Sequence, residues 1–314
     1  MVETRNFITT GRQIEGHVYL PAVLAAPTPS GPHDSAGADL TAPARATPGA
    51  GAGDGASVAA AAKASANDAD LRTIRLVVEY DGTDFAGWQR QPDQRTVQGT
   101  LEEKILAMTG ESVEVRGAGR TDAGVHAEGQ VASLALRSRI PPGGLLRGLN
   151  TILPADIVLT DVSEAPATFD ARFSARGKVY RYRVWNHPVR SAKHARTSWH
   201  CRDRLDLVAM RAAAAALGGE HDFAGFRASD CDRRNTVRVI RRFEIVRQGA
   251  ILDIEVEGTA FLRNMVRILA GTLVDVGRGK LDLATVVRVL ETRDRTAGGV
   301  TAPAHGLNLV RVIY

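Results

Sequence analysis

The hydrophobic pattern of this chain changes near Leu71, and the change limits what the chain can fold into. Of the 50 residues in 21–70, 18 are Ala, 6 are Pro and 6 are Gly, with no period that could bury one face. Such a segment cannot bury enough apolar surface to offset the entropy of ordering. An Ala-rich helix through residues 56–66 is possible locally but too short to persist alone. We therefore predict a disordered Ala/Pro/Gly-rich extension over residues 1–70.

Strand and helix patterns follow one another from Leu71 onward. Ile74, Leu76 and Val78 alternate with polar residues, as in a strand with one buried face, up to Tyr80. A helix is indicated from Thr96, because the apolar residues after it recur on one helical face. We predict further strands over residues 113–116, 130–136, 157–162, 179–185, 238–246, 251–256 and 307–313, and helices over 145–152, 205–217, 261–276 and 281–290.

This mixture lacks the regular strand–helix alternation of a parallel sheet. It predicts an α+β fold, in which helices cover one face of a mixed, largely antiparallel sheet. The second part of the chain repeats the style of the first, so we expect two similar halves. We place the N-terminal half of the catalytic domain at residues 71–175 and the C-terminal half at 176–314.

Composition excludes several classes of protein. Cys201 and Cys231 lie far apart without a Cys-x-x-Cys pattern, so neither a disulfide framework nor a structural zinc site is indicated. No apolar run is long enough to span a bilayer, and the amino terminus has no signal-peptide pattern. We expect a soluble, cytoplasmic protein without a membrane partner.

The charge distribution favours a polyanionic partner. Residues 1–70 hold four basic and seven acidic side chains, which leaves 36 basic and 28 acidic ones in residues 71–314 and a net charge of +8 there. A basic surface of this kind is typical of proteins that bind nucleic acids.

The densest chemical signal lies between Arg116 and Ala127. It contains three glycines, two arginines and the carboxylate of Asp122. Glycine lets a ligand approach the main chain, and arginine offers a planar fork for phosphates or stacked bases. The Gly-Lys-Ser/Thr of a phosphate loop and the Gly-x-Gly-x-x-Gly of a dinucleotide fold are absent from this segment. An ordinary glycine-rich turn with a solvated aspartate is the alternative interpretation.

Residues 117–127, Gly-Ala-Gly-Arg-Thr-Asp-Ala-Gly-Val-His-Ala, resemble the active-site motif of the bacterial tRNA pseudouridine synthase A (TruA) family. Several other segments resemble further blocks of that family in the expected order: 81–91, 96–102, 169–176, 178–182 and 261–267, with Gly271 and residues 306–307. The resemblance covers residues 71–314, whereas residues 1–70 depart from the family pattern.

The resemblance implies a fold and a reaction. The fold is a pair of halves like RNA-recognition motifs around a central active-site cleft. The reaction flips a uridine out of the anticodon stem-loop of tRNA, at tRNA positions 38–40, and converts it to pseudouridine without a cofactor. The family also implies a homodimer whose tRNA touches both subunits. Two alternatives are a non-catalytic tRNA-binding or folding module and a pseudouridine synthase for another RNA.

The resemblance assigns three catalytic residues. Asp122 would begin the reaction, either by adding to the nucleoside or by removing a sugar proton, and the sequence does not choose between these. Arg267 would pair with Asp122, orient it and keep it ionised; the alternative is an exposed arginine on the polar side of its helix. Tyr180 would stack on the target base, although its spacing alone is more typical of a core aromatic.

Further residues are candidates for substrate binding. Arg120 could fill the space left by the flipped nucleotide, and Thr121 lies beside it. His126 could contact RNA or make a structural hydrogen bond. Candidate phosphate contacts are Arg172, Arg176, Lys178, Arg181, Arg183, Arg233, Arg234, Arg238, Arg241 and Arg242.

We expect no metal site. Asp81 and Asp84 have no third carboxylate or histidine that would complete a coordination shell, so we expect them to support the active site. His200, His221 and His305 show no zinc spacing.

Deleting residues 1–70 should leave folding and activity nearly unchanged, because their composition contributes nothing to a core. We expect the free energy of unfolding to stay within about 0.5 kcal/mol of the full chain, the usual range for changes away from packed structure. Urea unfolding and turnover of tRNA by the two proteins check this. A loss of solubility or of turnover in the shortened protein would show that the extension packs or binds.

Overall fold

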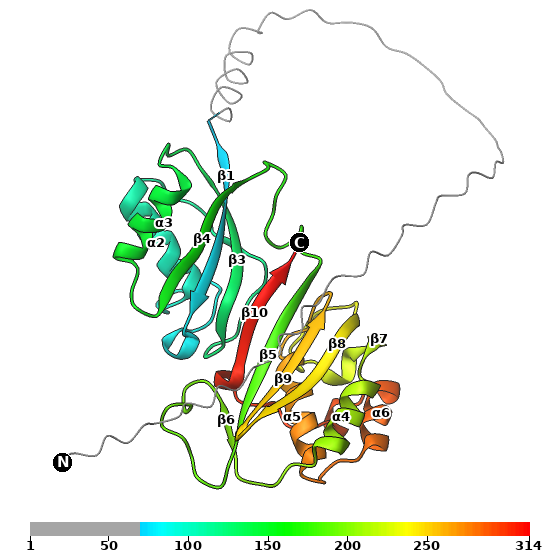
Figure 1. The fold of residues 1–314 in the computed structure, drawn as a ribbon. Coiled ribbons are helices and arrows are strands. Elements are labelled where there is room, and N and C mark those ends of the chain that lie inside the picture. Colours follow the sequence, from blue (N-terminus) through cyan, green and yellow to red (C-terminus); the bar gives the residue numbers. More distant parts are fainter. Residues whose placement is uncertain (1–69) are drawn as a thin grey trace, which may run out of the picture. The chain divides into compact units, whose positions relative to one another are not determined.

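The fold is a helix-covered sheet, seen in a computed structural model that describes residues 70–314 (Figure 1). The predicted extension over residues 1–70 lies almost wholly outside the described residues. Ten strands form one sheet with the order β4-β1-β3-β10-β5-β9-β8-β7, while β2 pairs with β3 and β6 pairs with β5. No helix of residues 70–314 is both long and apolar enough to cross a membrane.

The strands fall into two groups along the chain. The first group is β1 (Arg72–Tyr80), β2 (Arg116–Gly117), β3 (His126–Leu136) and β4 (Ile157–Ala165). The second is β5 (Gly177–Asn186), β6 (Trp199–Cys201), β7 (Gly219–Asp222), β8 (Val237–Gln248), β9 (Ile251–Gly258) and β10 (Leu307–Ile313). Most neighbours run antiparallel; β10 with β3 and β5 with β6 are parallel.

Within residues 70–314, five α-helices share the hydrophobic core with this sheet. They are α2 (Val97–Thr109), α3 (Pro142–Ile152), α4 (Leu207–Ala216), α5 (Met265–Gly277) and α6 (Leu283–Thr292). Short 3₁₀ turns lie at Gly82–Asp84, Phe223–Phe226, Arg295–Ala297 and Ala304–Gly306. The observed architecture confirms the predicted α+β class with a largely antiparallel sheet.

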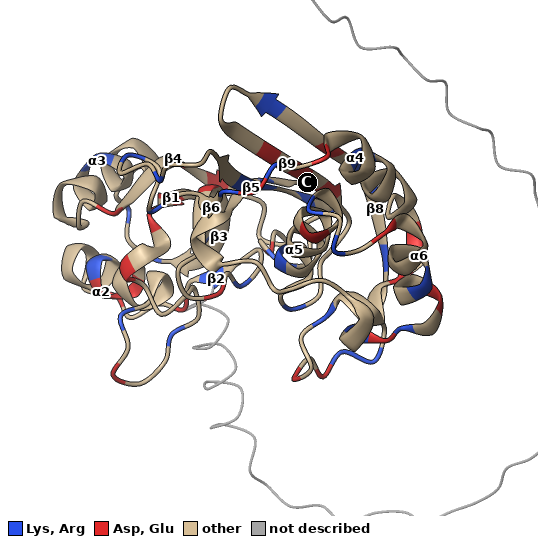
Figure 2. Ribbon diagram, turned by 90° about the horizontal axis from the view of Figure 1, so that it is seen from below, with Lys and Arg blue, Asp and Glu red and all other residues tan. Residues whose placement is uncertain are grey.

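Alternation along the strands explains which face carries the helices. Ile74 and Leu76 of β1 are each 1% exposed and belong to one hydrophobic cluster that includes apolar residues of all five helices. The opposite face carries charges: Arg183 Nε lies 2.8 Å from Asp253 Oδ1, and Arg181 Nε lies 2.9 Å from Glu255 Oε1. Because successive side chains of a strand point to opposite faces, one face of the sheet is packed and the other is charged. Basic and acidic positions are interspersed over much of the described chain (Figure 2).

The strand order repeats. In the first group β1 lies between β4 and β3 and is antiparallel to both, and in the second β5 lies between β10 and β9 and is antiparallel to both. This repeat supports the prediction of two similar halves; their boundary at residues 175 and 176 stays a prediction. The two groups meet where β10 also pairs with β3, at Asn308 opposite His126 and Leu309 opposite Ala127.

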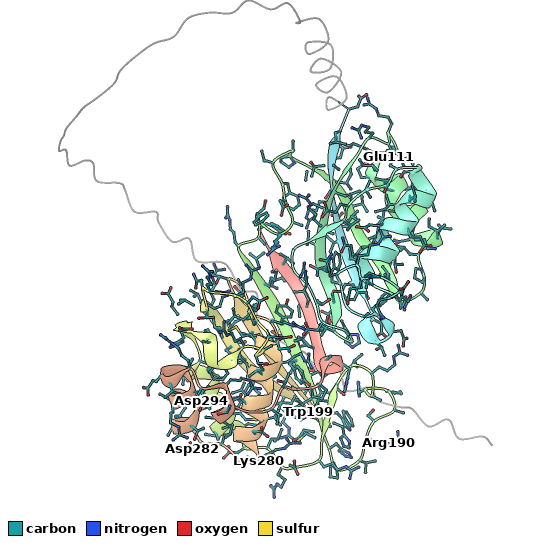
Figure 3. All side chains as sticks on the ribbon, turned by 180° about the vertical axis from the view of Figure 1, so that it is seen from behind. Glu111, Arg190, Trp199, Lys280, Asp282 and Asp294 are labelled. Carbon is teal, nitrogen blue, oxygen red and sulfur yellow. The ribbon has the colours of Figure 1, made fainter. Side chains whose placement is uncertain are left out.

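Helix ends follow local capping chemistry. Thr96 caps α2 by accepting the backbone N–H of Gly99 at 3.2 Å, and Gly110 ends that helix at a φ of 75°. Asp282 caps α6 by accepting the N–H of Thr285 at 2.8 Å, next to Lys280 (Figure 3). These signals are readable in the sequence, and both helices were predicted.

Two predicted elements need correction, and two strands were missed. The strand over residues 113–116 is wrong, because only Arg116–Gly117 pairs with β3 and the N–H of Val115 donates instead to Glu102 Oε1 at 3.0 Å. The helix over residues 261–276 begins later, at Met265, because Asn264 has a left-handed φ of 59°. The short strands β6 and β7 were not predicted.

Replacing Gly271 with alanine should destabilise the fold. A Cβ at this position would lie 1.8 Å from the carbonyl oxygen of Val300, so the backbone must move. Overpacking of this kind costs about 1–3 kcal/mol. Gly143→Ala is the matched control, because the nearest neighbour of a Cβ added there is the Arg147 guanidinium, at 3.5 Å. Urea unfolding should show the loss only for Gly271→Ala; equal stability of the two variants would contradict the packing argument.

Candidate active site

The loop between β2 and β3 holds Asp122. Its backbone is fixed by neighbours on both sides: Trp88 N–H donates to the carbonyl of Thr121 at 3.0 Å, and Val125 N–H donates to the carbonyl of Asp122 at 3.1 Å. The buried Tyr80 hydroxyl lies 2.8 Å from Thr121 Oγ1. Asp122 therefore sits on a rigid turn, with its side chain 35% exposed.

The segment that precedes α2 supports this loop. Gly87 has a φ of 98°, and a Cβ there would lie 2.7 Å from the carbonyl oxygen of Thr121. Only glycine combines that torsion with so close an approach. Asp81 and Asp84, which also lie in this segment, contact the Arg196 guanidinium at 3.4 and 2.9 Å. Among residues 70–314, no cluster of His, Cys, Asp and Glu is suited to a metal ion.

Arg267 of α5 contacts Asp122 directly. Its Nη1 lies 3.2 Å from Asp122 Oδ2, and its side chain is 18% exposed. Two further acceptors fix the guanidinium: the carbonyl of Ala302 at 2.8 Å from Nε, and Asn264 Oδ1 at 2.9 Å from Nη1. A mostly buried cation needs such partners. The structure thus brings together two residues that are 145 positions apart in the chain.

Tyr180 lies close to this ion pair, on the helix-covered face of β5. Its ring meets Phe261 edge-to-face, with centroids 5.2 Å apart, and only 8% of the residue is exposed. Burial raises the pKa of its phenol, and Tyr80 and the charge of Asp122 add to the effect. The phenol is therefore neutral at physiological pH. A base can reach only a small part of this ring unless neighbouring side chains move.

Arg120 and His126 lie in different environments. Arg120 is exposed, and its Nε donates to Gln89 Oε1 at 3.0 Å. His126 is 7% exposed; its Nδ1 accepts the N–H of Gly82 at 3.1 Å, and its Nε2 lies 2.9 Å from the carbonyl of Arg196. Its Nδ1 also lies 3.2 Å from Asp81 Oδ1, so contacts within the protein engage both ring nitrogens. This geometry favours the structural alternative for His126.

Lys178 and Arg172 lie beside the start of the loop. Lys178 shares a strand face with Tyr180, and its Nζ would lie 2.9 Å from a Cβ at Gly119. Burial lowers the pKa of the Lys178 ammonium, and the nearby positive charge of Arg172 lowers it further. The other residues near the centre that the sequence analysis did not single out are Tyr80, Gln89, Asn264 and Ala302. Side-chain type alone gives no signal for them: Tyr80, Gln89 and Ala302 act by contacts across the fold, and Asn264 by its place directly before the helix that carries Arg267.

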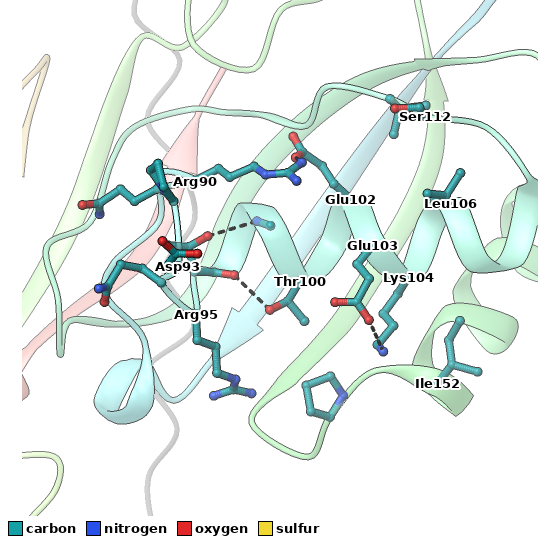
Figure 4. Close-up of a pocket in the computed structure, with 17 residues that line it drawn as sticks. Arg90, Asp93, Arg95, Thr100, Glu102, Glu103, Lys104, Leu106, Ser112 and Ile152 are labelled. Carbon is teal, nitrogen blue, oxygen red and sulfur yellow. Dashed lines mark hydrogen bonds and ion pairs between the residues drawn. The ribbon is translucent and has the colours of Figure 1, made fainter.

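A pocket of about 1120 Å³ lies elsewhere, beside α2 (Figure 4). Arg90, Arg95, Leu106 and Ile152 are among its lining residues, and the Glu103 carboxylate lies 2.8 Å from Lys104 Nζ within it. None of the candidate catalytic residues lines it. The candidate active site is thus defined by its contacts and not by this pocket.

Comparison with known proteins identifies the family of this chain. The sequence model of a family described as tRNA pseudouridine synthase matches residues 76–174 and 213–314. The chain belongs to that family. Asp122 and Arg267 lie within the two stretches that the family model matches, whereas Tyr180 and Lys178 lie in the unmatched residues between these stretches.

Curated relatives match most of the chain. The tRNA pseudouridine synthase A of Citrifermentans bemidjiense is 46% identical over 245 residues, which cover 78% of this chain and 98% of the relative. That of Pelobacter propionicus is 48% identical over 244 residues, which cover 78% of this chain and 100% of the relative. The similarity therefore extends over whole enzymes of the tRNA pseudouridine synthase family.

Replacing His126 with phenylalanine should lower stability, because it leaves the buried N–H of Gly82 without its acceptor. An unsatisfied buried donor costs about 1–3 kcal/mol. His126→Asn should recover part of this loss, since its side-chain oxygen can accept the same N–H. Urea unfolding of both variants, with KM for tRNA, checks the expectation. Unchanged stability with a raised KM would identify His126 as an RNA contact instead.

Proposed function

We propose that this tRNA pseudouridine synthase family member isomerises uridines of the anticodon stem-loop of tRNA, at tRNA positions 38–40, and that Asp122 starts the reaction. The observation that carries the proposal is the Asp122 and Arg267 ion pair. Arg267 holds one carboxylate oxygen of Asp122, which lies on a rigid loop. The family model matches residues 76–174 and 213–314 of the same chain.

The reaction asks for little beyond a positioned carboxylate and a closed site. The bond between C1′ of the ribose and N1 of uracil breaks, a bond between C1′ and C5 forms, the hydrogen on C5 leaves as a proton, and N1 takes up a proton. No group donor takes part and no net redox change occurs, so we propose that no cofactor is needed. Asp122 can act here as a nucleophile or as a base.

The free oxygen of Asp122 fits this role. Oδ2 is held by Arg267, whereas Oδ1 has no hydrogen-bond partner within residues 70–314. An aligned carboxylate with one open oxygen is ready to meet a substrate without reorganising. Tyr180 is neutral and adjacent, which suits contact with an uncharged base. Arg120 is exposed at the same loop and suits the space vacated when the nucleotide flips, a step that costs a few kcal/mol.

Assembly and location complete the proposal. We place the protein in the cytoplasm, in keeping with its two free cysteines, Cys201 and Cys231. A homodimer that binds tRNA across both subunits is the assembly that the family resemblance suggests. Phosphate contacts would come from the exposed arginines and from Lys178.

Release of tritium from tRNA labelled at C5 of uracil should require Asp122. The native protein should release tritium, because formation of the new carbon–carbon bond expels that hydrogen, and Asp122→Asn should release none above background while binding tRNA normally. Asp161→Asn is the matched control, since this carboxylate is exposed and pairs with Arg75 at 3.0 Å. It should retain full activity.

Other outcomes point to the alternatives. Tight tRNA binding by the native protein without tritium release would support a non-catalytic tRNA-binding module. Release from ribosomal RNA or isolated stem-loops in preference to tRNA would indicate a synthase for another RNA.

A further inference from the structure

Phe173 is exposed in a way that packing does not explain. It lies in the segment between β4 and β5, and 81% of the residue is accessible, the largest fraction for a large hydrophobic residue within 70–314. A single exposed apolar residue is ordinary. Here, however, the backbone that presents the ring is held in place from several directions.

Several hydrogen bonds hold the segment around Phe173. Asp170 Oδ1 accepts the N–H groups of Arg172 and Phe173, each at 2.8 Å. Ala171 is fully buried; its N–H donates to Ser133 Oγ at 3.0 Å, and its carbonyl accepts the Tyr314 hydroxyl at 2.8 Å. The segment thus runs beside the C-terminal end of β10 (Figure 1). The ring is held outward by an ordered loop.

A guanidinium lies beside the exposed ring. The Arg172 guanidinium lies 5.5 Å from its centroid. Arg172 and Arg176 are both exposed, and neither guanidinium has a carboxylate partner within the described part of the chain. An exposed aromatic ring beside unpaired cations is the composition of surfaces that bind single-stranded nucleic acid.

This surface is close to the candidate active site. Arg172 lies near enough to Lys178 to act on its charge, and Lys178 Nζ lies against Gly119 of the Asp122 loop. Tyr180 is two positions along the same strand, about 7 Å further. A nucleic-acid strand with one base at Tyr180 can therefore pass over Lys178 and Arg172 toward Phe173.

We propose that Phe173 is a stacking platform for an unpaired base of the tRNA substrate near the target uridine, with Arg172 binding an adjacent phosphate. The proposal rests on the proposed function for its ligand. Stacking is tolerant of sequence because every base has a flat face. The site would thus hold the RNA strand in register while the uridine occupies the catalytic centre.

The first experiment measures tRNA affinity of the full chain at several salt concentrations. Phe173→Ser should weaken binding about tenfold at every concentration, with an unchanged slope of log K against log salt, because stacking releases no counterions. Phe173→Tyr, which keeps an aromatic ring, should bind tRNA as tightly as the native protein. Arg172→Gln should lower the slope by about one, as expected for a phosphate contact. Val208→Ser, a change at a residue that is 77% exposed on α4, should alter neither quantity.

The second experiment places a reporter at the site. Phe173→Trp should show fluorescence quenching by an unmodified tRNA transcript beyond that of the native protein, and Asp122→Asn in the same chain should leave the quenching intact. Binding and quenching without tritium release would remove the proposed catalysis but keep the stacking site. Unchanged affinity of Phe173→Ser, or no added quenching, would overturn it. A fall in molecular mass by light scattering for Phe173→Ser would overturn it too, because Phe173 would then contact a second copy of the chain.

Discussion

The pairing of β10 with two different neighbours is the constraint on which the site depends. Its residues bond to β5 in an antiparallel ladder and to β3 in a short parallel one. These two ladders place the loop before β3 next to β5 and α5. Without that junction, Asp122 would belong to one packed group of strands and its partner Arg267 to another, and no local interaction would join them.

The ion pair itself is fixed by groups that have no chemistry of their own. Asn264 accepts a left-handed conformation, directs its amide oxygen to Arg267 and begins α5, while the carbonyl of Ala302 holds the other edge of the guanidinium. Each contact restricts the conformations of the long Arg267 side chain. The carboxylate is therefore presented in one orientation at little entropic cost when a substrate arrives.

Local signals in the sequence predicted the fold class and most elements, since caps such as Thr96 and Asp282 act within one helical turn. They failed at Val115, whose N–H bonds to a glutamate of α2 thirteen residues earlier, and at Asn264, whose left-handed backbone delays the start of α5 to Met265. The contact of Asp122 with Arg267 spans most of the folded chain, so no spacing rule could predict it. Only the family resemblance indicated it, and the roles of both residues stay predictions.

The position of β10 also orders events during synthesis. A ribosome makes β3 early, yet the strand that joins it to β5 comes only with residues 307–313. Until those residues emerge, only the short strands β2 and β6 pair along these edges of β3 and β5, and the loop that holds Asp122 lacks the junction that places it beside α5. A nascent chain therefore carries every proposed catalytic side chain before the strand pairing that brings them together can form.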